Sequence, residues 1–125
     1  MPELPAAIRA YVDAFNACDL PAMLACLDDS IAFRNIMEGE VSFEATGKLA
    51  FADLAAGSLE VFTERHRQVL DAITVGEVTL MRTEFTARVS RDLPGGWVAG
   101  ERVVLAGRSL YELRDGLILR IVDER

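Results

Sequence analysis

The stretch LMRTEFTARV, residues 80–89, contains an arginine and a glutamate two positions apart. Because side chains alternate across a β-strand, Arg82 and Glu84 would share one face of such a strand. The other face would carry Met81, Thr83, Phe85, Ala87 and Val89. If the charged face lines a pocket, its arginine and carboxylate are candidates for acid/base chemistry. If the charged face is exposed to solvent, Arg82 and Glu84 form a solvated ion pair of little energetic value. The more apolar character of the opposite face favours this second interpretation.

Two more polar residues each follow an apolar row on a predicted strand. Asp123 follows the alternating apolar residues of LILRIVDE, and Asn35 follows Phe33 in SIAFRNI. Buried polar side chains must find partners, so each residue serves either a pocket or a structural hydrogen bond. An acid in an apolar cleft is a candidate catalytic group, which makes Asp123 the first residue to locate in the fold.

Helices that would support these strands are predicted in the first half of the chain. A second, short helix would begin after Asp19, which can cap it, and a third is predicted in KLAFADLAAGSLEVF. The first helix has an apolar stripe at helical spacing, made of Leu4, Ile8, Tyr11, Val12 and Phe15.

From about residue 66 onward the pattern predicts strands only: RHRQVLDAIT, EVTLMRTEFTARVS, WVAGERVVLAGRSLYEL and LILRIVDE. The separating segments VG, DLPGG and RDG each contain glycine and suit a tight reversal. Helices followed by an antiparallel meander indicate an α+β fold, with the helices on one face of the sheet. A long twisted sheet of this kind leaves a tapered cavity for a small ligand, and we expect the segment MEGEVSFEAT to form a loop that closes it.

The opening segment YVDAFNACDL and the closing segment YELRDGLI resemble the nuclear transport factor 2-like superfamily. That superfamily includes ketosteroid isomerases, SnoaL-like polyketide cyclases and limonene-type epoxide hydrolases. The resemblance extends over roughly residues 4–124 and implies one SnoaL-like domain spanning residues 1–125. It also implies a cone-shaped, cystatin-like curved antiparallel sheet wrapped on the N-terminal helices, and a homodimer. The fold alone does not define an activity, because folds of this kind host many functions.

The three branches differ at the positions that would do chemistry. A ketosteroid isomerase-like site would use a tyrosine on the first helix, and Tyr11 matches it. Asn35 stands where the general base would be, and an amide cannot take up a proton at neutral pH. Ser109 stands where that branch, like the SnoaL-like cyclases, places an acid.

The epoxide hydrolase branch is similar at more positions. Its Arg-x-Asp pair resembles Arg82 and Glu84, its terminal acid resembles Asp123, and its Tyr-x-Asn resembles Phe33-Arg34-Asn35. The resemblance implies Asp123 as the base that activates water, Glu84 as the acid and Arg82 as the clamp between them. The predicted substrate-binding residues are Asn35, Phe33, Tyr11 and Ser109.

Two functions therefore remain open. The first is an acid/base enzyme of the epoxide hydrolase, isomerase or cyclase type that acts on a small hydrophobic molecule. The second is a non-catalytic ligand-binding or dimerisation domain of the same fold, in which Asn35, Asp123 and Tyr11 only orient a bound apolar molecule.

Composition limits the partners. A net charge of −7 without a Lys/Arg cluster argues against nucleic acid and against anionic membranes. The first residues resemble neither a signal peptide nor a membrane span, so we expect a cytoplasmic protein. Cys18 and Cys26 lack metal-ligand spacing, and His66 is the single histidine, so we expect no metal site. The glycine-containing LPGGW lacks the lysine and helix of a phosphate loop, and we expect no cofactor.

Overall fold

The computed structural model describes residues 2–94 and 96–125. Its helices are α1 (Ala6–Asn16), α2 (Leu20–Ala25) and α3 (Lys48–Val61). Its strands are β1 (Leu27–Met37), β2 (Glu40–Thr46), β3 (Phe62–Val75), β4 (Val78–Val89), β5 (Arg102–Arg114) and β6 (Leu117–Glu124).

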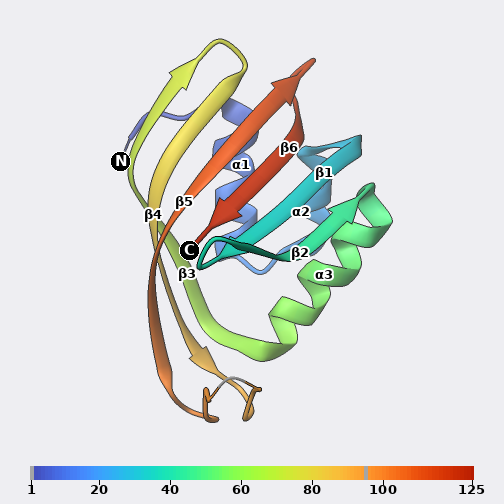
Figure 1. Cartoon of the computed structure of the whole chain (residues 1–125). Helices are drawn as coiled ribbons and strands as arrows, with labels where there is room; N and C mark the ends of the chain where they lie inside the picture. The colour runs from blue at the N-terminus through green and yellow to red at the C-terminus, as the bar shows by residue number, and fades with distance from the viewer. Residues whose placement is uncertain (1, 95) are drawn as a thin grey trace.

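The strands form one six-stranded sheet in the order β2-β1-β6-β5-β4-β3. Strands β3 to β6 pair in sequence as an antiparallel meander, and β1 lies parallel to β6. Figure 1 shows the sheet strongly twisted and unclosed, with α1 and α2 behind it and α3 beside the end that carries β2. The predicted α+β architecture, a curved sheet wrapped on N-terminal helices, is confirmed.

The turns follow the local sequence where glycine allows a left-handed backbone. Asp115 and Gly116 both have positive φ, 52° and 79°, as the two-residue hairpin between β5 and β6 requires. Glu38 and Gly39 do the same between β1 and β2, with φ of 53° and 82°. The prediction of a loop over MEGEVSFEAT is therefore wrong. Only Ala45 of β2 is buried, so this strand lacks the apolar face by which a sequence pattern is recognised.

The helices cover the inner face of the sheet with the predicted apolar stripe of α1. Ile8, Tyr11, Val12 and Phe15 are all buried. The Asp19 side chain caps α2 as predicted, because its Oδ1 accepts a hydrogen bond of 3.1 Å from the Ala22 backbone N–H. Helices and sheet thus share one core.

Aromatic side chains continue this core from the helices to the sheet. The Tyr11 ring lies 5.9 Å from the Tyr111 ring of β5 and 6.4 Å from the Phe51 ring of α3, measured between centroids. The Phe33 ring of β1 meets Phe51 edge-on at 5.5 Å. Such tilted and edge-to-face pairs fix ring orientation as well as bury apolar area. They therefore hold the Tyr11 hydroxyl at a defined place in the interior.

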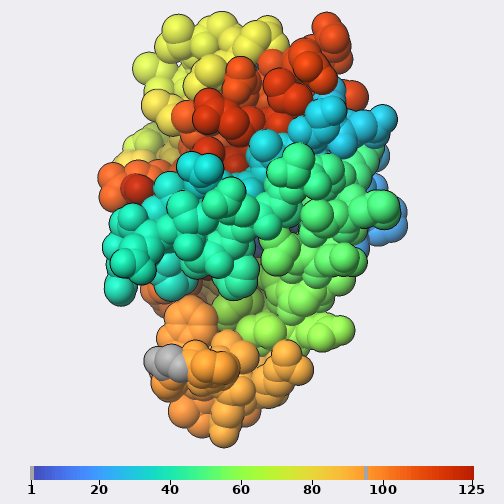
Figure 2. Space-filling view, turned by 45° about the vertical axis from the view of Figure 1, so that its right-hand side comes forward, coloured from blue at the N-terminus to red at the C-terminus, as the bar shows by residue number. Residues whose placement is uncertain are grey.

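The long strands β4 and β5 extend beyond the helices. Their connecting segment, in orange in Figure 2, projects from one end of the molecule. Trp97 in this segment packs against Phe62, with ring centroids 5.7 Å apart. Across residues 2–94 and 96–125, no helix has the length and apolar character that crossing a bilayer would require.

Candidate functional site

Polar side chains from three neighbouring strands meet on the inner face of the sheet. The strand register places Asp123 of β6 opposite Asn35 of β1 on one side and opposite Ser109 of β5 on the other. All three residues are buried. Because directly opposite residues in a sheet point to the same face, the register gathers these side chains into one row.

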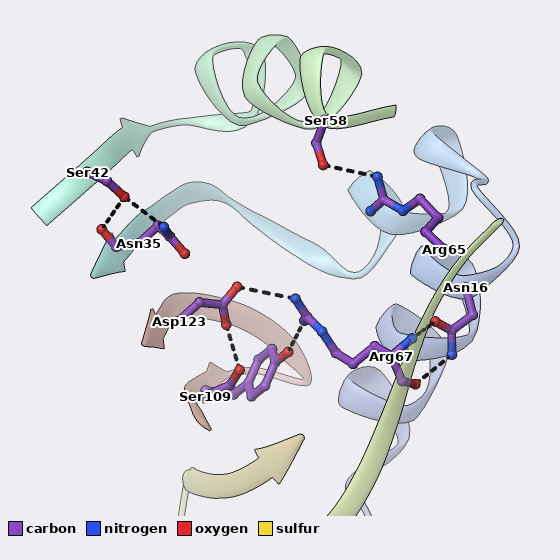
Figure 3. A network of polar contacts seen from close by, with 9 residues as sticks. Asn16, Asn35, Ser42, Ser58, Arg65, Arg67, Ser109 and Asp123 are labelled. Carbon is purple, nitrogen blue, oxygen red and sulfur yellow. Dashed lines mark hydrogen bonds and ion pairs between the residues drawn. The ribbon is translucent and has the colours of Figure 1, made fainter. Parts of the chain in front are cut away.

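Asp123 is held from two directions. The Ser109 hydroxyl donates a 2.6 Å hydrogen bond to Asp123 Oδ1, and Arg67 Nη2 lies 3.6 Å from Asp123 Oδ2 (Figure 3). The exposed fractions of Asp123 and Arg67 are 6% and 5%. Hydrogen bonds and ion pairs to an ionised group are the stronger polar contacts of a protein interior. They fix the orientation of the Asp123 carboxylate.

Arg67 reaches Asp123 from β3 because α1 positions its backbone. The Asn16 carboxamide accepts a 2.7 Å hydrogen bond from the Arg67 backbone N–H and donates a 3.0 Å bond to the Arg67 carbonyl (Figure 3). The Arg67 guanidinium donates to the Tyr111 hydroxyl at 3.4 Å and lies 4.2 Å from the centroid of the Phe15 ring. Burial alone would lower the pKa of Arg67, but the Asp123 carboxylate and the tyrosines raise it above its ordinary value. Arg67 is therefore a permanent cation.

Two tyrosine hydroxyls lie next to this ion pair. Burial, followed by the neighbouring Tyr111 and Asp123, raises the pKa of Tyr11 well above its ordinary value. Burial also raises the pKa of Tyr111 to about 12. Both phenols are therefore neutral near pH 7 and can donate hydrogen bonds.

A small cavity adjoins the Asp123 carboxylate. Its volume is about 10 Å³, and its wall includes Arg67, Thr83, Gly107, Ser109, Asp123 and Arg125. This volume is close to what one water molecule needs, and the wall supplies several polar partners for it. The site has room for one water-sized species beside Asp123.

The other predicted binding residues have structural partners. Asn35 Nδ2 donates a 2.7 Å hydrogen bond to Ser42 Oγ, and the Ser42 hydroxyl donates to the Asn35 carbonyl at 3.2 Å. Asn35 therefore ties β1 to the hairpin with β2, and it borders the site through its place beside Asp123. Phe33 is half-buried against Phe51 and supplies apolar surface.

The prediction that Arg82 and Glu84 share a cavity with Asp123 is wrong. The Arg82 side chain is 66% exposed and forms an ion pair with Asp71 on the outer face of the sheet. Glu84 lies on that same face and is half-buried. The opposite face of β4, which carries Met81 and Phe85, is buried against the helices. The apolar row occupies the core because its burial is worth far more than a solvated ion pair.

Arg67 is the site residue that sequence reasoning missed. In the segment ERHRQVL, Arg65, Arg67 and Val69 alternate, and all three are buried. Two arginines in register with a core valine were the available signal, because charged residues rarely share a face with core positions unless they are paired. His66 points the other way and is exposed. Within residues 2–94 and 96–125, no three His, Cys, Asp or Glu side chains gather closely enough to hold a metal ion.

The fold and this row of polar side chains first define a class. A curved sheet wrapped on helices around an apolar core, with a row of polar side chains on its inner face, is the nuclear transport factor 2-like architecture. Residues 8–121 match the family model described as the SnoaL-like domain, and the chain belongs to this family. The resemblance predicted from the sequence is confirmed. No curated protein matches the chain in sequence.

Solved structures of the same fold come from several branches. A provisionally named polyketide cyclase of Xanthomonas campestris pv. campestris is 26% identical, covering 95% of this chain and 87% of its own, with a TM-score of 0.77. A Catenulispora acidiphila protein with a ketosteroid isomerase-like fold, in complex with trimethylamine, is 13% identical, with a TM-score of 0.78. The match covers 97% of this chain and 85% of that protein's chain. An LEH-like epoxide hydrolase of Mycobacterium tuberculosis is 17% identical, with a TM-score of 0.75. The match covers 96% of this chain and 80% of that enzyme's chain. The last two likenesses show the fold alone.

Proposed function

We propose that the chain is an acid/base enzyme that adds water to a small hydrophobic epoxide, with Asp123 as the general base. The observation that carries this proposal is the water-sized cavity beside a buried, oriented carboxylate. A general base must lie within hydrogen-bond reach of the proton that it removes. A water in this cavity would meet that condition.

In the proposed reaction one proton passes from water to Asp123 and then to the product, so that Asp123 ends in its starting state. Asp123 takes a proton from the bound water while the water oxygen bonds to an epoxide carbon and the ring C–O bond breaks. A neutral Tyr11 hydroxyl donates a hydrogen bond to the ring oxygen as negative charge develops there. The resulting alkoxide then takes the proton back from Asp123, which restores the carboxylate and leaves a diol. Arg67 fills the clamping role that had been predicted for Arg82.

Turnover of styrene oxide in isotopically labelled water tests this function. We expect a diol that carries one labelled oxygen, and we expect Asp123→Asn to lower the rate by a factor of roughly 100 or more, the range of a lost general base. Asp53→Asn is the matched control, because Asp53 is an exposed acid on α3. Full activity of the Asp123→Asn variant, or no diol from several small epoxides, would contradict the proposal.

A second role, self-association, is favoured by the outer face of the sheet. The register aligns Ile73, Leu80, Leu110 and Val122 in one row across four strands. Ile73 and Leu80 are exposed, and a hollow of about 540 Å³ lies over this region. An exposed apolar patch with a polar rim is typical of a protein-protein contact. We propose that it binds a second copy of this chain.

The charges beside this row are arranged for a two-fold contact. Arg108 pairs with Glu124 on one side of the row, and Arg120 pairs with Glu112 on the other. A two-fold axis along the row would place β5 over β5 of the second copy in the opposite direction. Arg108 would then face Glu112 of the second copy, and Glu124 would face Arg120. A symmetric interface requires this kind of self-complementarity.

Light scattering coupled to size-exclusion chromatography tests the dimer. The wild-type chain should have the mass of two copies, and Leu80→Glu should have the mass of one. Leu49→Glu is the control, because Leu49 is also an exposed leucine but lies on α3. A monomeric wild-type chain, or a dimer that survives Leu80→Glu, would exclude this interface.

A further inference from the structure

The interior of the cone holds more positive than negative charge. Arg65 and Arg67 are buried, and Arg125, which follows β6, is half-buried. Among the described residues 2–94 and 96–125, Asp123 is the one buried acid. Arg67 pairs with Asp123, so of these three arginines Arg65 and Arg125 are without a paired acid among these residues, in a protein whose net charge is −7. Buried charges are normally paired, so this excess calls for a further anion.

Two of the three arginines have no acidic partner within the described part of the chain. Arg65 Nη1 donates to Ser58 Oγ at 3.0 Å, but its Nε is buried without a hydrogen-bond partner among those residues. No acidic side chain there forms an ion pair with Arg65 or Arg125. Their guanidinium carbons instead lie over aromatic rings, 4.1 Å from the centroid of Phe15 and 5.1 Å from that of Phe85. An aromatic face attracts a cation but supplies no negative charge to neutralise it.

The surroundings of Arg65 and Arg125 disfavour their charged forms, because the ring contacts do not replace the solvation that these cations lose. Burial lowers the pKa of Arg65, and burial together with the positive charge of Arg67 lowers the pKa of Arg125. Figure 3 shows Arg65 and Arg67 reaching from the same strand into the interior. An anion bound between such groups would relieve both the repulsion and the loss of solvation.

Arg125 lies in the wall of the cavity beside Asp123. Arg67 lies in the same wall, whereas the Arg108 guanidinium pairs with Glu124 on the outer face of the sheet. The backbone of Arg125 is anchored, because Arg125 N–H donates to the Ile36 carbonyl at 2.9 Å and the Arg125 carbonyl accepts from Glu38 N–H at 3.0 Å. Only the side chain is therefore free to shift when a ligand binds.

Gly107 makes room for this side chain. A Cβ at Gly107 would come within 3.2 Å of the Glu124 carbonyl, 3.3 Å of Thr83 Oγ1 and 3.7 Å of Arg125 Cγ. The missing side chain leaves a water-sized space, which is also the size of one carboxylate oxygen. A larger ligand requires the Arg125 side chain to shift off Phe85 while its guanidinium stays in contact with the charge of the ligand.

We propose that the site binds a small organic monoanion, a carboxylate whose charge lies between Arg67 and Arg125 and whose apolar body packs on Phe85. This inference rests on the proposed function and names the substrate class of that same site: an epoxide that carries a carboxylate. The carboxylate end would contact the arginines, and the epoxide end would face Asp123. Charge-assisted contacts to two guanidiniums would orient the substrate.

Calorimetric titration with benzoate tests the anion site, and benzamide is the neutral probe of the same shape. At constant ionic strength benzoate should bind saturably and benzamide should not. Arg125→Gln should weaken benzoate binding about tenfold or more, the effect of one lost charged hydrogen bond. Arg102→Gln, at an exposed arginine elsewhere on β5, is the matched control. Circular dichroism checks that both variants are folded.

The outcomes separate this inference from the proposed reaction. Asp123→Asn should lower turnover by a factor of roughly 100 or more. It should bind benzoate more tightly, because it removes a like charge next to the ligand. Benzoate binding without turnover of any epoxide would therefore overturn the reaction and keep the anion site. Equal binding of benzoate and benzamide, no binding of benzoate, or unchanged binding by Arg125→Gln would overturn the anion site. Displacement of benzoate by chloride at matched concentration would show a site for inorganic anions and would also overturn the organic assignment.

Discussion

Ser109 and Asp123 lie directly opposite each other on β5 and β6, joined by a 2.6 Å hydrogen bond from the serine hydroxyl to the carboxylate. Two branches of the superfamily resemble this chain but place an acid at the serine position. Here the acid comes from the neighbouring strand, and the serine becomes its partner. The buried carboxylate of the inner face thus lies at the end of β6.

Loss of the serine hydroxyl should destabilise the fold. Ser109→Ala leaves a buried carboxylate oxygen without its hydrogen-bond donor. We therefore expect the free energy of unfolding to fall by about 1–3 kcal/mol. Urea denaturation measures this change. Ser30→Ala, at an exposed serine on β1, should change the stability by less than about 0.5 kcal/mol. Equal stabilities for the two variants would mean that the buried hydrogen bond does not contribute.

Removal of the Arg67 charge should cost more than removal of the serine hydroxyl. Arg67→Met leaves the buried Asp123 carboxylate without its cation, for which we expect a loss of about 3–5 kcal/mol in the free energy of unfolding. The double variant with Asp123→Asn should recover part of this loss, because an amide needs no counter-charge. Arg102→Met is the exposed control. Additive losses in the double variant would show that the two side chains are not coupled.

Stability should fall in strongly alkaline solution because of the buried tyrosines. The pKa of Tyr111 is raised to about 12 from an ordinary value near 10, and that of Tyr11 is also raised. Between these values the unfolded chain loses phenolic protons that the folded chain retains. The contribution is thus fully present below about pH 10 and is lost as the pH rises toward 12, at about 1.4 kcal/mol per pH unit for each phenol.

The absorbance of tyrosinate measures this directly, because Tyr11 and Tyr111 are the two tyrosines of the chain. In the folded protein the ionisation should begin well above pH 10, and in urea it should occur near pH 10. Tyr111→Phe should remove part of the pH dependence of stability. Ionisation of both phenols near pH 10 in the folded protein would contradict their burial.

The adjacent residues Met81 and Arg82 of β4 should differ sharply in how much they contribute to the free energy of unfolding. Met81→Ala opens space in the core and should cost about 2–5 kcal/mol, whereas Arg82→Ala breaks an exposed ion pair and should cost less than about 1 kcal/mol. Thermal and urea unfolding of the two variants compare them directly. A larger loss from Arg82→Ala would mean that the charged face of β4 lies inside.

The local pattern of apolar, capping and turn residues was sufficient to predict most helices and strands of the fold. The spacing of apolar residues predicted α1, the capping aspartate predicted α2, and glycine-containing turns separated the strands of the meander. These features act between residues close in sequence, where helix and strand periodicity are directly readable. β2 was missed because its side chains are almost all exposed and leave no apolar row.

The sequence by itself determined that Arg82 and Glu84 share a face of β4, because alternation is a property of the strand alone. Only the tertiary structure decided which face is inside and which arginine meets Asp123. That choice depends on the pairing of strands distant in sequence and on the helix face that covers them. The Asn16 clamp on β3 and the register of β5 with β6 bring Arg67, rather than Arg82, to the buried carboxylate.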